Sequence, residues 1–249
     1  GEAIGGVADD ANGLWLVLFN GNFLDARHIV DSTVIGVLPV QSALPVNVAS
    51  SSRGTIRFSR AGDKIAIATE SPAGSWWADF DKVTGTVASP WRQVHTAPGY
   101  SLDFSPNGNM LYVPFSSTNG PAWNADRIRQ HDLINNTNVD LAFSASGIAL
   151  GPDDRVYFAP YGVASLGVIS NPNVGGGANA VQAGVSLGAC LTGYNLSKTL
   201  FLESLLTPPP PAPTIVTPTE GSLTNDNTPN ITGTCETGAT VTIREGATT

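Results

Sequence analysis

The stretch Phe104–Phe115 reads FSPNGNMLYVPF, and the same pattern recurs as FSRAGDKIAIAT at Phe58–Thr69 and as LGPDDRVYFAPY at Leu150–Tyr161. The three starts are 46 residues apart, twice running. Each copy joins an apolar residue, a turn rich in Pro, Asp, Asn or Gly, and an alternating apolar run, which predicts a β-hairpin. A looser copy, ADDANGLWLVLF, occupies Ala8–Phe19, and a weaker fifth copy is expected from Leu196.

Further strand signals follow each hairpin at about the same position within each 46-residue unit. They are SWWADFDKVTG at 75–85, DRIRQHDLINN at 126–136 and ASLGVISNP at 164–172. Four short strands in about 46 residues is the size of one propeller blade. No segment of helix length carries a 3.6-residue apolar period, so helices should be nearly absent. The pattern predicts an all-β chain with a β-propeller, whose interblade positions include Ile65, Ile67, Leu111, Val113, Val156 and Phe158.

The hairpin FSPNGNMLYV resembles the inner strands of bacterial WD40-like and YVTN-like propellers. The run SGIALGPDDRVYFAPYGVASLGVISNPN, residues 146–173, resembles the last blades of propellers in large exported bacterial surface proteins. The resemblance covers Gly54–Leu206 and, more weakly, Ala3–Val40. It implies the propeller fold and no particular activity, because propellers host many functions.

Four full units and part of a fifth fit between Gly1 and Leu206. A propeller ring usually closes by combining strands from both ends of the domain in one blade. The sequence given starts where the first strand of a repeat unit is expected. We therefore expect these blades to belong to a larger ring with sequence upstream of Gly1. The alternative is a small five-bladed ring with one thin blade.

The segment Thr207–Pro213 reads TPPPPAP and predicts an extended polyproline II spacer. It divides the chain into a propeller over 1–206, a linker over 207–213 and a second module over 214–249. Pro213–Ile243 resembles bacterial Ig-like (Big-type) repeats, most closely at Asn230–Ile243. An Ig-like sandwich needs more residues than follow the linker. We therefore expect 214–249 to be its N-terminal part, completed by further chain or by a neighbouring subunit.

Composition narrows the class of partner. Lys and Arg number 12 against 20 Asp and Glu, a net charge of −8, which argues against nucleic acid because phosphate binding needs a basic face. Only 13% of residues are charged, so the surface is neutral and polar, as on exported β-proteins and virion proteins. The sequence contains no run of 18 apolar residues, so it predicts no membrane-spanning helix. We expect an extracellular, cell-surface or virion-surface location.

Histidine and cysteine predict neither a metal site nor a cofactor. His28, His95 and His131 are scattered without metal-ligand spacing, and packing or hydrogen-bonding roles are expected for them. Cys190 and Cys235 form no CxxC motif. We predict that they are not bonded to each other, because the proline spacer separates them.

The acidic pairs Asp9-Asp10 and Asp153-Asp154 fall in hairpin turns, where an aspartate caps its own backbone. Asp79 and Asp81 flank Phe80 and are expected at a turn or on a sheet edge. No catalytic dyad is predicted from any of these pairs. Motifs for a serine hydrolase, a phosphate-binding loop or a zinc protease are absent from the sequence.

Four tryptophans are the candidate ligand-binding residues: Trp76, Trp77, Trp91 and Trp123. They fall near predicted strand ends or loops, and exposed tryptophan often stacks on sugars or anchors protein interfaces. The alternative is that they fill the interfaces between blades.

Two functions follow from these observations. The first is a non-enzymatic structural or adhesive binding module, part of a larger exported bacterial protein or of a virion appendage. Its partners would be protein or carbohydrate on a surface, and further chain or neighbouring subunits in an assembly. The second is a propeller-fold polysaccharide lyase or glycosidase, which would need paired carboxylates in the central funnel. Asp25, Asp79 and Asp103 are the candidates for that pair.

Overall fold

The computed structural model divides the chain into two compact units, Gly1–Leu205 and Leu206–Thr249. The residues that it describes are 3–9, 13–20, 22–30, 33–45, 48, 53–118, 121, 125–176, 179–193, 196, 214–217, 225, 230 and 232–234. No residue in these ranges lies in a helix, as the apolar pattern predicts. Within the same ranges, no helix has the length and hydrophobicity needed to cross a membrane.

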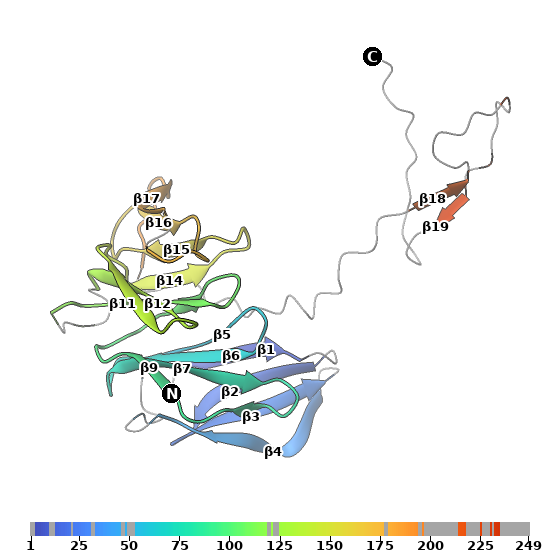
Figure 1. Ribbon diagram of the computed structural model, residues 1–249, viewed down its shortest axis with the longest axis horizontal. Coiled ribbons are helices and arrows are strands. Elements are labelled where there is room, and N and C mark those ends of the chain that lie inside the picture. Colours follow the sequence, from blue (N-terminus) through green and yellow to red (C-terminus); the bar gives the residue numbers. More distant parts are fainter. Residues whose placement is uncertain are drawn as a thin grey trace. The chain divides into compact units, whose positions relative to one another are not determined.

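The described residues of the first unit form four antiparallel sheets, each built from consecutive strands (Figure 1). Blade 1 comprises β1 (Ile4–Ala8), β2 (Gly13–Asn20), β3 (Phe23–Val30) and β4 (Thr33–Ala43). Blade 2 comprises β5 (Gly54–Phe58), β6 (Lys64–Thr69), β7 (Gly74–Asp81), β8 (Thr86–Val87) and β9 (Arg92–His95), the last two both pairing with β7. Blade 3 comprises β10 (Asp103–Phe104), β11 (Met110–Phe115), β12 (Arg127–Asp132) and β13 (Thr137–Leu141). Blade 4 comprises β14 (Gly147–Leu150), β15 (Val156–Ala159), β16 (Ser165–Ile169) and β17 (Ala180–Ser186).

The first strands of successive blades lie next to one another, β1 beside β5, β5 beside β10, and β10 beside β14. Figure 1 shows the four sheets following each other in chain order. This is the arrangement of β-propeller blades, in which the first strand of each sheet is innermost. The all-β propeller class predicted from the 46-residue spacing is therefore confirmed.

The repeated turns close the predicted hairpins through the same hydrogen bonds. The backbone N–H of Ser59 donates to the carbonyl of Lys64 at 3.0 Å, and that of Ser105 donates to Met110 at 2.9 Å. The hydroxyls of these two serines accept the N–H groups of Lys64 and Met110. In blade 4 the N–H of Gly151 donates to the carbonyl of Arg155. This acceptor is four residues further along the chain, whereas in the other two turns the acceptor is five residues further along.

The six predicted interblade side chains are at most 1% exposed. Ile65 and Ile67 pack against blade 1, and Leu111 and Val113 pack against blade 2. Val156 and Phe158 pack against blade 3. Because successive side chains of a strand point to opposite faces, the residues between them face the following blade. Burial of each such apolar side chain contributes about 1.5–3 kcal/mol to the stability of the fold.

Polar side chains also join successive inner strands. The Ser101 hydroxyl contacts both the carbonyl and the N–H of Ile148, and Asp103 accepts the N–H of Leu150 at 2.9 Å. One unit later the Ser146 hydroxyl donates to the carbonyl of Gly193 at 3.1 Å. The fifth copy predicted from Leu196 lies almost entirely outside the described residues.

The described part of the second unit is a pair of antiparallel strands, β18 (Thr214–Thr217) and β19 (Thr232–Thr234). The linker over 207–213 and most of the predicted Ig-like module lie outside the described residues. The Ig-like assignment of this unit stays a prediction. Cys190 is exposed with a free thiol, whereas Cys235 lies outside the described residues, so the absence of a bond between them also stays a prediction.

Candidate functional site

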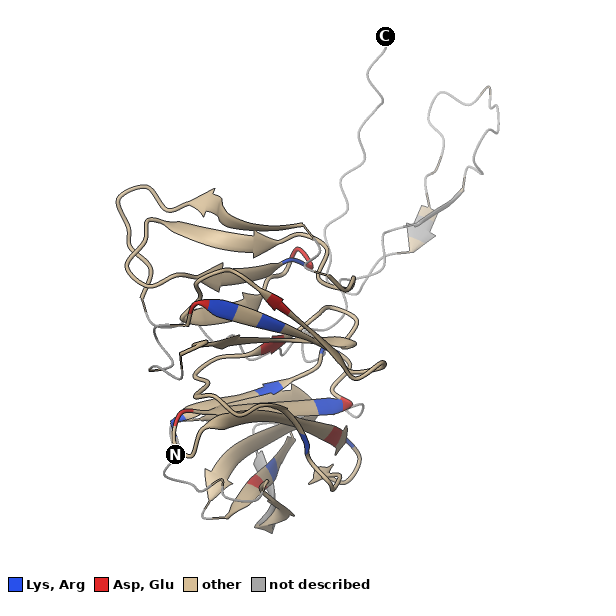
Figure 2. Cartoon of the chain, turned by 60° about the vertical axis from the view of Figure 1, so that its left-hand side comes forward, with Lys and Arg blue, Asp and Glu red and all other residues tan. Residues whose placement is uncertain are grey.

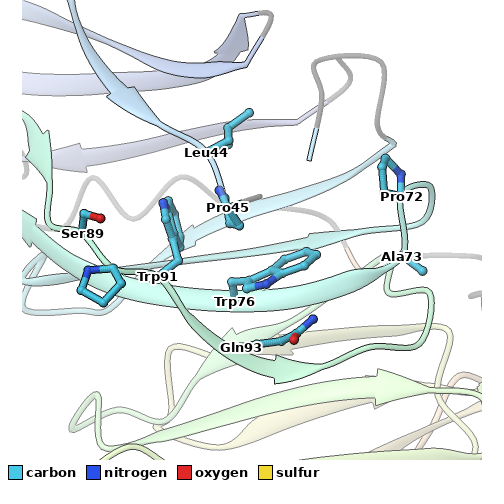
Figure 3. A pocket seen from close by; sticks show the side chains of 9 residues that line it. Leu44, Pro45, Pro72, Ala73, Trp76, Ser89, Trp91 and Gln93 are labelled. Carbon is cyan, nitrogen blue, oxygen red and sulfur yellow. The ribbon is translucent and has the colours of Figure 1, made fainter. Parts of the chain in front are cut away.

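A pocket of about 600 Å³ lies where blades 1 and 2 meet in the first unit. Its lining comes from the residues that follow β4, the β6–β7 connection, β7, the segment before β9, and β9 itself: Leu44, Pro45, Pro72, Ala73, Trp76, Ser89, Pro90, Trp91 and Gln93. Figure 3 shows the Trp91 indole on the side of Ser89 and the Trp76 indole on the side of Pro72. Two of the four candidate tryptophans are therefore brought together.

Trp76 and Trp77 are neighbours on β7 and point to opposite faces of blade 2. Trp76 belongs to the core shared with blade 1 and lines the pocket with 8% of its surface exposed. Trp77 is buried in the core between blades 2 and 3, with the Arg92 guanidinium 4.2 Å from its ring centroid. Trp77 fills a blade interface, and Trp123 lies outside the described residues.

The half-buried Trp91 is held by a hydrogen bond to the neighbouring blade. Its indole N–H donates to the carbonyl of Ala43 at 2.9 Å, and its ring packs against the core of blade 1. A second link runs from the backbone N–H of Val87 to the Ser42 hydroxyl, also at 2.9 Å. These bonds join blade 2 to the last residues of β4, so the walls of the pocket come from two connected sheets.

Gly74 lies next to the lining residue Ala73, and its role beside the pocket was not predicted from the sequence. Its φ is +153°, which disfavours residues with a Cβ, and an added Cβ would lie 2.3 Å from Cη2 of Trp76. The glycine therefore leaves the space in which the Trp76 indole lies. The signal in the sequence is a glycine two residues before a tryptophan on the same strand, hence on the same face.

The side chains that line the pocket carry no ionisable group. Ser89 and Gln93 supply its polar side chains and both are exposed. The pocket thus combines two indoles and three prolines with neutral hydrogen-bonding groups.

The three candidate carboxylates lie on three different blades, and none of them lines the pocket. Asp25 on β3 is 3% exposed and accepts hydrogen bonds from Asn20 at 2.6 Å and Gln41 at 2.9 Å. Asp79 on β7 is exposed and pairs with Arg92 at 3.1 Å. Each carboxylate therefore has its own partners.

Asp103 is the third candidate carboxylate and lies on the inner strand β10, 1% exposed. Its Oδ2 is 3.8 Å from Nε of Arg57, and it accepts the backbone N–H groups of Leu150 and Phe104. Burial raises the pKa of Asp103, while Arg57 and the two N–H groups oppose that shift. Its contacts join the inner strands of three blades.

As predicted, three aspartates accept backbone N–H groups of their own turns: Asp9, Asp81 and Asp153. The Asp154 carboxylate pairs instead with Arg60. Asp9 accepts the N–H of Gly13 at 2.6 Å and contacts the His28 ring at 2.5 Å, whereas Asp10 lies outside the described residues. Asp153 accepts the hydroxyl of Tyr157. Asp81, at the end of β7, accepts two backbone N–H groups of its turn.

The histidines have packing and hydrogen-bonding roles, as expected. His28 stacks on Trp15 at 4.4 Å between ring centroids. His95 accepts the N–H of Ala97, and His131 hydrogen-bonds Asn138. Burial lowers the pKa of both His95 and His131. In the described ranges, no cluster of three or more His, Cys, Asp or Glu could hold a metal ion.

Basic and acidic residues are mixed on the described strands, and several of them form ion pairs. Figure 2 shows basic and acidic residues interspersed along the strands of the first unit. Arg129 forms two hydrogen bonds with Asp140, at 2.7 and 2.8 Å, and Arg60 contacts Asp154 in another blade.

No protein family model matches the chain, and no curated protein sequence matches it. Among solved structures, it is similar to the GH74 enzyme of Niastella koreensis, with a TM-score of 0.47 and 12% identity over 72% of this chain and 24% of that chain. It is also similar to a putative 6-phosphogluconolactonase from Bacteroides fragilis, with a TM-score of 0.38 and 17% identity over 54% of this chain and 36% of that chain. The chain thus spans about a quarter and about a third of these two proteins. At this identity the likeness concerns the fold alone.

Proposed function

We propose that the chain is a non-enzymatic binding module, whose propeller blades present the pocket between blades 1 and 2 to a ligand on a surface. The observation that carries the proposal is the pairing of Trp76 and Trp91 in one pocket with a neutral lining. A concave site with apolar walls and a few polar groups is the usual form of a ligand-binding pocket. The neutral polar composition supports a place outside the cell or on a virion.

The positions of the candidate carboxylates favour binding over cleavage. General acid–base cleavage of a glycoside needs two carboxyl groups about 5–9.5 Å apart across the bond that breaks. Asp25, Asp79 and Asp103 lie on separate blades, and each is engaged by other residues. The lining of the pocket offers shape, aromatic faces and neutral hydrogen-bonding groups.

The test compares binding with turnover on the same ligands. The full chain is incubated with soluble surface polysaccharides and with surface protein preparations, and retention and chain cleavage are both measured. We expect retention of a ligand without products, and loss of retention on Trp91→Ala. The control is Phe23→Ala, which removes an aromatic residue that is 43% exposed and lies outside the pocket lining. Turnover that disappears when Asp25, Asp79 or Asp103 is replaced by Asn would contradict the proposal.

A further inference from the structure

We propose that the pocket between blades 1 and 2 binds a neutral carbohydrate, with the apolar face of a sugar ring against the indole of Trp91 and the small exposed part of Trp76. This inference rests on the proposed function and names the ligand class of the same site. The pocket volume of about 600 Å³ falls in the range of small-molecule sites, roughly 300–1,000 Å³. It accommodates a short oligosaccharide.

The aromatic residues supply the stacking surface. The face of an indole is electron-rich, so it attracts the weakly positive C–H groups that line one face of a pyranose ring. The N–H of Trp91 is engaged by the carbonyl of Ala43, which leaves the ring rather than its edge to meet a ligand. Pro45, Pro72 and Pro90 extend this apolar surface with rigid rings.

The polar residues match hydroxyl groups, which both donate and accept hydrogen bonds. The Ser89 hydroxyl and the Gln93 amide can each do both. Trp76, which also lines the pocket, carries an indole N–H as a further donor. A sugar ring stacked on the indoles presents its hydroxyls at its rim, where such groups can reach them.

The charge of the site argues for a neutral sugar. Arg92 follows Trp91 in the sequence, but it pairs with Asp79 and lies over Trp77 on the opposite face of blade 2. No lining residue offers a positive charge to a uronic acid or a sulfated sugar. Bringing an ionised carboxylate into the pocket without a cation would therefore be unfavourable.

A proline-rich peptide is the other ligand class that fits an aromatic-lined groove. Such a segment offers carbonyl acceptors and few donors, because proline has no backbone N–H. It would use the donors of Trp76, Ser89 and Gln93 and leave the acceptors of Ser89 and Gln93 without partners from the ligand. The mixed donor and acceptor set of the pocket favours the carbohydrate.

The site is also fixed in shape before a ligand binds. The Trp91 indole is tied to blade 1 by its hydrogen bond, and the Trp76 indole lies in the space that Gly74 leaves. Pre-organised side chains lose little conformational freedom on binding, which improves affinity. The expected binding therefore leaves the structure of the first unit unchanged.

The experiment is titration of the full chain with defined probes, followed by tryptophan fluorescence and calorimetry. The probes are cellotetraose, mannotetraose, galactotetraose and diacetylchitobiose as neutral sugars, a tetragalacturonate as an acidic sugar, and decaproline as a peptide. We expect at least one neutral sugar to bind, with affinity about tenfold or more lower in Trp91→Ala. Gln93→Ala should weaken binding by roughly two- to tenfold, the effect of one hydrogen bond.

Controls keep the result independent of folding. Phe23→Ala should bind like the parent chain, and Trp91→Phe should retain most of the affinity because it keeps an aromatic face. Circular dichroism checks that each variant is folded.

Binding of decaproline or tetragalacturonate alone overturns the assignment of a neutral carbohydrate ligand but leaves the proposed binding function intact. Binding of no neutral probe, or equal losses in Trp91→Ala and Phe23→Ala, also overturns it. Cleavage of a bound sugar refutes the proposed function instead.

Discussion

Replacing Gly74 with alanine tests how the pocket is held. The new Cβ would lie 2.3 Å from Cη2 of Trp76, so the indole must move by about 1 Å to regain a normal contact. The φ of +153° adds backbone strain of roughly 1–3 kcal/mol. Truncating a buried tryptophan costs about 3–5 kcal/mol, and a displaced indole loses a fraction of that. We expect Gly74→Ala to lower the free energy of unfolding by about 2–4 kcal/mol.

A double-mutant cycle with Trp76→Ala separates the collision from the backbone strain. When the indole is gone, the new Cβ has no ring to displace and Gly74→Ala costs only the strain. The double variant should therefore be more stable than the sum of the single effects predicts, by about 1 kcal/mol or more. Gly162→Ala is the matched control, because this glycine has a φ of +70° and no atom within 4 Å of an added Cβ.

The measurement is urea unfolding followed by far-ultraviolet circular dichroism, since tryptophan fluorescence itself changes in these variants. If the two substitutions are additive within about 0.5 kcal/mol, Gly74 and Trp76 act independently and the argument fails. Sugar titration of Gly74→Ala adds a functional readout. Displacement of the indole should weaken binding even where the chain remains folded.

Three further predictions concern the rest of the chain. The raised pKa of Asp103 contributes stability that is fully present below its ordinary pKa of 3.8 and is lost as pH rises through the raised value. The melting temperature of the parent chain should therefore fall across this pH range. In Asp103→Asn this fall should be absent, because the amide does not titrate. Phe158→Ala should lower the free energy of unfolding in urea by about 3–5 kcal/mol, because this side chain is fully buried between blades 3 and 4. The control Val181→Ala, at a position 52% exposed, should change it by less than about 0.5 kcal/mol. Alkylation and mass analysis without reductant should find Cys190 and Cys235 both free, and a peptide joined through these two residues would contradict this.

The blade architecture could be predicted from the sequence because its signals are local. A turn such as SPNGN between two apolar runs closes a hairpin whatever surrounds it, and the alternation of Ile65 and Ile67 with Ala66 assigns each to a face. The 46-residue spacing then indicates repeated sheets, since one blade cannot bury both of its faces alone. The interblade residues predicted in this way are the ones that the structure buries.

The candidate site depended on contacts that no local pattern records. Trp76 and Trp77 are adjacent and chemically identical, and both are buried in cores. Only the packing of blade 2 between blades 1 and 3 leaves a part of Trp76, and not of Trp77, at the pocket. Asp79 and Asp103 likewise look equivalent in the sequence, yet one is exposed and the other buried. Strand pairing and side-chain alternation are dictated by neighbours along the chain. Burial, pKa and the meeting of Leu44 with Trp91 are set by how separate sheets pack, so only the tertiary structure decides them.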